Sequence, residues 1–533
     1  MRVHFNFPPP RSCRDCSSRE RAARTDDRTA LECQAFAFVP PHDLRAEENS
    51  RPPRANKKLF AAGLTAFASL AFASCAVGPN YHRPETPVPA AFKSSASATP
   101  AAPVLASDWW TLFQEPELNQ LVEATIAANP SIQAAVARVD QARAATRIAT
   151  GALYPEINLD PSVRRARSFG GSNSTQILDP TLPVTSGRSR ISTLYSLPLD
   201  LNYELDVWGR VRRQRENARY TEQASADDFA VVRQTAISDV AQGYFTIRLY
   251  DTQIEIYQKA LDLYRQQLEL TRTKYTAGLA LQTDLLQAQT QVYTATNQLL
   301  DVQRSRVKQE HALAILTGRA PEEFSLAARP LSTAIPVVPA GLPANLLNRR
   351  PDVAEAENKL AAANAQIGVA QAAFFPSFSL TGSAGYENTE LKGLTNWENR
   401  VWSIGPSLNL PIFQGGRLTG ELAQAKAGYQ ELVANYRSAV LGAFRDVEDQ
   451  LADLNLLAQK ADSLEKTLAS ARENSRLTEL QYRQGLTTYL QVLTANQTLL
   501  TNELSAAEAQ SQRLTASVLL MKALGGGWSG SLP

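Results

Sequence analysis

A duplication inside the chain limits what it can fold into more than any other feature. The proline-free stretch Gly209–Gly318 aligns without a gap on Gly416–Gly525, at a shift of 207 positions. At this shift Tyr275 falls on Tyr482. A repeat of this kind indicates a fold built from two similar units, and it outweighs the several domains that a length of 533 residues would suggest.

Each copy predicts a very long helical hairpin. Residues 210–277 hold no proline and a single internal glycine, and at about 1.5 Å of rise per residue they form a helix of roughly 100 Å. Apolar residues recur every seven positions on a face wider than a two-stranded seam, which indicates burial on both sides, as in a ring of helices. Gly278 and Gly485 can take the left-handed conformation that ends a helix, so a second helix returns from each. A soluble coiled-coil scaffold would carry the same heptads, because heptads fix packing and not function.

A shorter, alanine-rich helix precedes each hairpin. It is expected at 117–152, and its second copy lies 221 positions further on, where Pro130 falls on Pro351. The chain therefore divides into a first repeat, a proline-rich linker and a second repeat, at residues 108–320, 321–343 and 344–527.

Between the short helix and the hairpin of each copy, the apolar period changes from helical to two. The alternation is clear in Leu197–Leu205, Phe378–Tyr386 and Trp402–Leu410, and Ile157–Arg165 is a weaker partner strand. Strands of about ten residues with one apolar face suit a transmembrane barrel. Half-buried strands of a soluble sheet would alternate in the same way. The sequence, however, supplies no second layer to cover the apolar faces, and this favours the barrel.

Four strands cannot close a barrel, and lipid excludes an open sheet edge. Copies must therefore combine. The predicted fold class is an α+β membrane protein, in which the four strands of each protomer complete a trimeric 12-stranded barrel that continues into a long α-helical periplasmic barrel. The polar segments 168–190 and 387–400 are expected to face the outside of the cell.

The N-terminal region predicts export and a lipid anchor. A basic pair at 57–58 precedes a short apolar run at 59–73 and small residues before Cys75, as in a secretory signal. The end of the run resembles a bacterial lipobox, in which the cysteine is lipidated and becomes the mature N-terminus, although Phe72 stands where that pattern favours leucine. A plain signal cut near Cys75 is the alternative. Ala76, rather than aspartate, follows the cysteine, which by the same resemblance favours sorting to the outer membrane.

The segments around this signal differ in composition. Residues 1–55 are rich in arginine and proline, and we expect a mis-assigned start or a disordered leader ahead of a lipoprotein signal peptide at 56–74. The proline- and alanine-rich stretch 75–107 predicts an extended, lipid-anchored tether. The tryptophans at 109–110 are expected to pack against the helices, with a position at the membrane interface as the alternative. Residues 528–533 form a short tail.

The chain shows no sign of an enzyme. After Cys75 there is no further cysteine and there are only two histidines, neither with companions at metal-ligand spacing. Glycine-rich nucleotide loops and a nucleophile elbow are also missing from the sequence. We therefore expect no metal and no cofactor beyond the covalent lipid on Cys75. A net charge of +2 with 20% charged residues argues against nucleic acid as a partner, and the basic run at 210–215 is expected at the inner lipid-headgroup boundary.

Several features in a fixed order resemble the outer-membrane factor family, the TolC-type trimeric export channels, and in particular the lipoprotein branch that serves multidrug (RND-type) efflux pumps. They are the lipobox with Gly78-Pro79-Asn80-Tyr81, the duplicated plan of helix, strand pair and hairpin, and Tyr482-x-x-Gly485-Leu486. The resemblance implies a homotrimer in the bacterial outer membrane with a long periplasmic extension. It implies a periplasmic adaptor (membrane fusion protein) and an inner-membrane pump as partners, and a passive duct for drugs or other small molecules.

The resemblance also implies roles for individual residues. The pairs Gly278-Leu279 and Gly485-Leu486 match the helical tips that dock the adaptor. A second set matches the periplasmic gate of the closed channel: Thr283, Asp284, Tyr482, Leu490, Gln491 and Thr494.

The gate departs from the family pattern in its charges. Thr487 stands where some members place an arginine, and Gln491 and Thr494 stand where others hold a ring of acidic residues. A constriction that is polar and neutral is therefore expected.

Two other classes of protein would share part of the pattern. A lipid-anchored periplasmic adaptor would carry one helical hairpin and a β-rich lipoyl-like domain, in place of two copies with a strand pair inside each. A coiled-coil scaffold without a pore would be soluble in water once its lipid is removed.

Overall fold

The computed structural model of the chain describes residues 76–89, 91–93, 106–168, 190–332, 334–336 and 348–528. All of them belong to one compact unit, Ala68–Pro533. The predicted leader, the signal peptide and the lipidated Cys75 lie outside the described residues, as do most of the linker and the tail.

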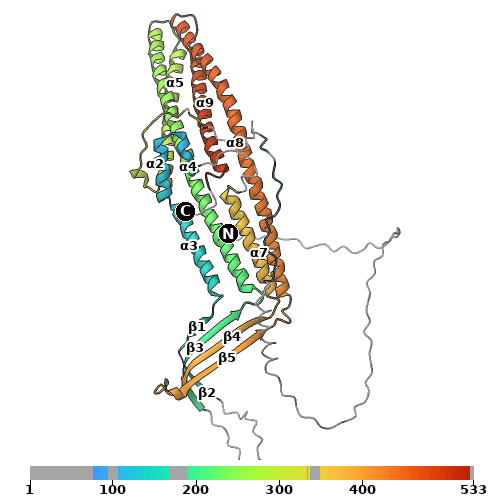
Figure 1. The fold of residues 1–533 in the computed structure, drawn as a ribbon. Helices are drawn as coiled ribbons and strands as arrows, with labels where there is room; N and C mark the ends of the chain where they lie inside the picture. The colour runs from blue at the N-terminus through green and yellow to red at the C-terminus, as the bar shows by residue number, and fades with distance from the viewer. Residues whose placement is uncertain are drawn as a thin grey trace, which may run out of the picture. The chain divides into compact units, whose positions relative to one another are not determined.

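Four long helices form the two predicted hairpins. Helices α4 (Arg210–Thr276) and α8 (Arg417–Arg483) both have 67 residues, and helices α5 (Gln282–Leu316) and α9 (Tyr489–Ala523) both have 35. Helix α4 packs along α5, and α8 packs along α9, with α4 also contacting α9 (Figure 1). The equal lengths confirm the duplication and the single continuous helix expected from residue 210 onward.

Shorter helices precede the hairpins. They are η1 (Trp109–Phe113), α2 (Pro116–Ala128), α3 (Pro130–Gly151) and α7 (Pro351–Ala372), with short 3-10 turns at η2 (Pro321–Glu323) and η3 (Trp397–Asn399). The prediction of one helix over 117–152 is wrong at a single point. Pro130 has no N–H to continue a helix, and the Asn129 side chain accepts hydrogen bonds from the amides of Ser131 and Ile132 at 2.8 and 3.2 Å, which caps α3 as a new helix.

The strands form one antiparallel sheet in the order β1–β3–β4–β5, with β2 beside β3 on the same side as β1. Their bounds are β1 (Glu156–Leu159), β2 (Ser162–Ser168), β3 (Arg190–Leu205), β4 (Ser377–Asn388) and β5 (Arg400–Asn409). Strands β1 and β2 are two parts of the expected weak strand. Pro161 interrupts it, because proline cannot donate to the ladder. The sheet therefore has the width of four strands, as predicted.

The register collects the apolar side chains on one face of this sheet. One transverse row joins Ile157, Leu201, Gly382 and Ile404, whereas the neighbouring row of Asp200, Ser383 and Ser403 is polar. The apolar face has no cover among the described residues that would bury it: Trp402 is 74% exposed and Ile404 is 64% exposed. Figure 1 shows the strands beyond the ends at which α4 and α8 begin.

The main apolar core lies between the helices. Trp109 and Trp110 are 1% and 6% exposed, and with Phe113 they pack against α2, α4, α5 and α9. This confirms that the tryptophan pair packs on the helices. No helix in the described part of the chain combines the length and the apolar content that a membrane-spanning helix needs.

The N-terminal tether is more ordered than its composition predicts. Residues 76–83 are extended, as expected, but they lie against α4 and α7, and Phe92 is buried in a second apolar cluster with residues of α7, α8 and α9. The predicted extended form is thus seen in residues 76–83, whereas the packing of this segment on the helices was not predicted.

Candidate functional site

The two hairpins end in the same backbone motif. After α4, the amide of Gly278 donates to the carbonyl of Tyr275, and the amide of Leu279 donates to Lys274. The equivalent amides of Gly485 and Leu486 bond in the same way after α8. This is a Schellman ending, which needs a left-handed residue, and the glycines have φ values of 72° and 78°.

The motif leaves an apolar side chain at each tip. Leu279 is 78% exposed and Leu486 is 73% exposed. The sequence therefore located both tips correctly. Whether they dock a partner stays a prediction.

Helix α5 starts directly after the first tip. The Asp284 carboxylate accepts a hydrogen bond from the amide of Leu281 at 3.3 Å, so it satisfies one of the free amides at the helix N-terminus and complements the helix dipole. Thr283 is exposed beside it. The first pair of predicted gate residues thus lies at the tip, with Asp284 also stabilising the helix start.

The second hairpin places three predicted gate residues on one exposed side of α9. Leu490 is 58% exposed, and Gln491 and Thr494 are exposed next to it. The Thr494 hydroxyl donates to the carbonyl of Leu490 at 2.9 Å, and the Thr487 hydroxyl donates to the side-chain oxygen of Gln491. The polar groups of this surface are therefore neutral and bonded within their own helix turn.

Tyr482 is the point at which the two hairpins are tied together. Its hydroxyl shares a hydrogen bond of 3.2 Å with Thr271 of α4. The Lys274 ammonium lies 3.8 Å from the centre of the Tyr482 ring and donates to the Tyr482 carbonyl at 2.5 Å. We call Thr271, Lys274 and Tyr482 the tip tie. Among the hydrogen bonds of the described residues, none joins Tyr482 to Asp284.

Burial governs the electrostatics of this tie. It raises the pKa of the Tyr482 phenol, against the hydrogen bond with Thr271, so the hydroxyl is neutral at physiological pH. Burial also lowers the pKa of the Lys274 ammonium. Sequence reasoning identified Tyr482 but missed Thr271 and Lys274, because helix-surface residues some 200 positions away give no local signal of contact.

The interior of the hairpins behind the tips is unusually polar. The Ser475 hydroxyl donates to the Asn496 side chain at 2.6 Å, and Gln497 donates to Gln291 at 3.1 Å. Gln267 is 3% exposed, and neither its amide nitrogen nor its amide oxygen has a partner in the described structure. Because an unsatisfied buried polar group costs free energy, this part of the bundle is less stable than an apolar core would be.

The basic run at the start of α4 is used inside the chain. Arg210 bonds both oxygens of Glu204 at 2.9 and 2.5 Å, and Arg212 pairs with Asp206 at 3.2 Å. The Arg213 side chain is 6% exposed and cannot reach a lipid headgroup. The interpretation of the run as a headgroup contact is therefore wrong for Arg213, whose partners are Glu216 and the N-terminal segment.

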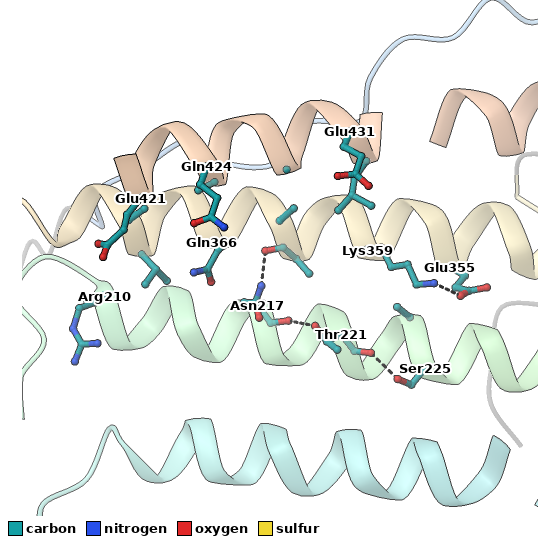
Figure 2. A pocket seen from close by; sticks show the side chains of 18 of the residues that line it. Arg210, Asn217, Thr221, Ser225, Glu355, Lys359, Gln366, Glu421, Gln424 and Glu431 are labelled. Atoms are coloured by element: carbon teal, nitrogen blue, oxygen red, sulfur yellow. Dashed lines mark hydrogen bonds and ion pairs between the residues drawn. The ribbon is translucent and has the colours of Figure 1, made fainter. Parts of the chain in front are cut away.

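A large cavity lies between α4, α7 and α8, away from the tips. It has a volume of about 1100 Å³, and its lining includes several alanines together with Asn217, Lys359, Glu421 and Glu431 (Figure 2). Lys359 pairs with Glu355 at 2.5 Å, and Asn217 donates to the carbonyl of Ala362 at 2.7 Å. The lining therefore combines alanines and other apolar side chains with amide groups and with charged groups of both signs. Within the described residues no three His, Cys, Asp or Glu side chains gather closely enough to hold a metal ion.

Comparison with known proteins identifies the family. The family model described as outer membrane efflux protein matches residues 121–319 and 342–526, which are the two repeats. The toluene efflux pump outer membrane protein TtgI of Pseudomonas putida is 32% identical over 479 residues, which cover 87% of this chain and 98% of that protein. The outer membrane protein OprJ of Pseudomonas aeruginosa is 30% identical over 463 residues, covering 86% and 94%.

Solved structures agree. The outer-membrane channel OprN superimposes with a TM-score of 0.78 at 29% identity, over 85% of this chain and 100% of that one. The open state of the MtrE outer membrane channel of Neisseria gonorrhoeae gives a TM-score of 0.72 at 31% identity, over 85% and 98%. These relatives are channel proteins rather than enzymes or scaffolds without a pore. Since the family model spans both repeats and the relatives are matched over almost their whole length, the chain belongs to the outer membrane efflux protein family.

Proposed function

We propose that the protein is a trimeric outer-membrane export duct that passively conducts small molecules from an inner-membrane pump and a periplasmic adaptor to the outside. The observation that carries the proposal is the uncovered apolar face of the sheet. A face with Trp402 and Ile404 mostly exposed would be costly in water but is the natural surface for lipid.

The open edges of the sheet explain why three copies are needed. Among the described residues, strand β5 pairs only with β4, and the edge formed by β1 and β2 pairs only with β3. Within a bilayer such edges would leave unpaired backbone groups, which lipid does not tolerate. Three protomers would pair every edge in a closed barrel of twelve strands, in keeping with the cyclic symmetry of most homo-oligomers.

The relatives support the location and the partners. They are named as outer membrane proteins of efflux pumps, among them a toluene pump and the antibiotic pump whose outer membrane protein is ArpC of Pseudomonas putida. We infer that the present chain also lies in the outer membrane and joins an adaptor and a pump. The exposed Leu279 and Leu486 of the tips provide the surface for the adaptor.

We also propose that Cys75 carries a covalent lipid, which would hold the N-terminus at the membrane. The support is the lipobox-like sequence before it. With lipid and barrel together, the protein has two independent attachments to the outer membrane.

The closed state is proposed to depend on the tips. The tip tie holds α4 against α8, while Leu490, Gln491 and Thr494 form the narrowest part of the duct. Thr283 and Asp284 lie at the neighbouring tip. Because the sequence holds no glycine-rich nucleotide-binding motif, we infer that opening is a population shift driven by the adaptor and the pump.

We assign the cavity between α4, α7 and α8 to the wall of the duct. Glu355, Lys359 and Gln366 of α7 line it, whereas Glu357, Asn364 and Gly368 of the same helix face the N-terminal segment on the opposite side. The charged and amide side chains of this lining suit contact with a water-filled passage.

The experiment that tests this function is single-channel recording of the purified protein in a planar bilayer. We expect discrete steps of low conductance, because the tips are closed without the adaptor. The Cys75→Ser protein should still need detergent for solubility, since the sheet itself faces lipid. A Cys75→Ser protein that is soluble without detergent and gives no conductance steps would instead indicate an adaptor or a scaffold.

A further inference from the structure

The described N-terminal segment crosses the seam between the two repeats. The amide of Val77 donates to the carbonyl of Trp208 at 2.9 Å, on the first repeat. The Asn364 side chain of the second repeat donates to the carbonyl of Pro79 at 2.9 Å, and Arg83 pairs with Glu357 at 2.5 Å. Residues 76–83 therefore lie along α7 and touch both α4 and α7. We call this segment the clasp.

A buried arginine is the centre of the contact. The Arg213 guanidinium donates to the carbonyl of Val77 at 3.4 Å, to the carbonyl of Gly78 at 3.3 Å and to the Asn80 side chain at 3.0 Å. Its charge is balanced by Glu216 at 2.7 Å. Burying a guanidinium is costly unless its donors are satisfied, and here the clasp supplies three of its acceptors.

The shape of the contact is as specific as its hydrogen bonds. Gly78 has a φ of 108°, and a Cβ atom on it would lie 2.5 Å from the Cα of Gly368. A Cβ atom on Gly368 would lie 2.9 Å from the Cγ of Arg213. Two glycines thus let the clasp, α7 and the arginine stem approach one another more closely than any other residues would permit.

The N-terminal end of the clasp lies beside the turn that joins strand β3 to helix α4. A Cβ atom on Gly209 would meet the Cβ of Ala76 at 2.9 Å, so Ala76 lies directly against this turn. The adjoining Trp208 stacks on Phe375 with ring centres 4.7 Å apart and donates its indole N–H to the carbonyl of Pro376 at 2.8 Å. The turn is therefore a rigid point built from both repeats.

We propose that the surface formed by Arg213, Asn364 and Gly368 is a binding site for an extended peptide, that its ligand is the chain's own clasp, and that Arg213 is the positioning residue. The docked clasp holds the two repeats together where strands become helices.

Hydrogen exchange of the full-length protein in detergent tests the proposal without relying on channel activity. Peptides that cover the clasp should be protected in the wild type and should exchange at least about tenfold faster in Arg213→Met, which keeps the aliphatic stem and removes the donors. Arg215→Met is the matched control, because Arg215 lies in the same basic run but is exposed, and it should leave clasp exchange within about twofold of wild type.

Misfolding would rule out Arg213→Met as a test, and fast exchange of the α4 and α7 amides would reveal it. A second variant, Gly78→Ala, keeps the proposal testable in that case. Gly78→Ala changes only the clasp, and the steric clash with Gly368 should release it by a similar factor. Clasp exchange that is unchanged in Gly78→Ala or in a folded Arg213→Met protein would overturn the proposal. Conductance steps recorded from the same samples report on the duct separately, so a protected clasp in a non-conducting wild type would refute the proposed function alone.

Discussion

Replacing Lys274 by methionine should raise the open probability of the purified channel about 30- to 100-fold. The change removes a cation–π contact with the Tyr482 ring and a hydrogen bond to the Tyr482 carbonyl. Together these contribute about 2–3 kcal/mol to the closed arrangement, and each 1.4 kcal/mol is about a tenfold change in an equilibrium. Methionine retains the length of the stem, so packing against α8 is largely kept. Single-channel recording measures the effect directly.

Two further substitutions make the test specific. Tyr482→Phe removes only the hydrogen bond with Thr271 and should raise the open probability by about tenfold or less. Lys308→Met removes an exposed lysine of α5 and should leave the channel closed. If Lys274→Met and Lys308→Met give the same traces as wild type, the tip tie does not hold the gate.

Replacing Asp251 by alanine should destabilise the protein by about 3–5 kcal/mol, the largest loss expected from a single side chain here. Its side chain is 3% exposed and accepts from Arg248 at 2.7 Å, from Arg306 at 2.6 Å and from the amide of Arg329 at 3.1 Å. Arg248 is itself 2% exposed. Removing the carboxylate leaves two arginines at a buried site with too little negative charge.

The network around Asp251 also binds residues 326–329, the segment that follows the first repeat. Arg248 donates to the carbonyl of Ala327, and Arg306 donates to the carbonyl of Leu326, both at 2.7 Å. Thermal or chemical unfolding in detergent should therefore show a large shift for Asp251→Ala. The surface pair of Asp262 with Arg265 is the control: Asp262 is 70% exposed, and Asp262→Ala should cost less than about 1 kcal/mol. Equal shifts for the two variants would contradict the assignment of the network.

The parts of the fold that sequence reasoning predicted are those with a local signal. Heptads and the absence of proline predict α4 and α8, and left-handed glycines predict the tips at Gly278 and Gly485. Strict alternation predicts β3 and β4, and the register then places their apolar residues on a single face. In each case the period of the pattern matches the period of the element.

The parts that were missed depend on contacts between distant positions. Composition predicts an extended N-terminal segment but not its packing, because a proline- and alanine-rich stretch gives no local signal of a contact with Arg213 more than 130 residues later in the chain. The break between α2 and α3 was missed because it depends on the Asn129 side chain, which caps the start of α3. The contact of Lys274 with Tyr482 joins two repeats whose relative placement only the tertiary structure defines.

Disulfide trapping between sheet edges tests the central claim, a barrel shared by three chains, most directly. Cys75 is the last cysteine in the sequence, so single cysteines can be introduced in β2 and in β5, stepping along the two edges in a panel of pairs. Non-reducing gels of oxidised membranes should show covalent dimers and trimers for the pairs in register, with no band beyond three copies. Only monomers across the whole panel, or a ladder that continues past three, would contradict the account.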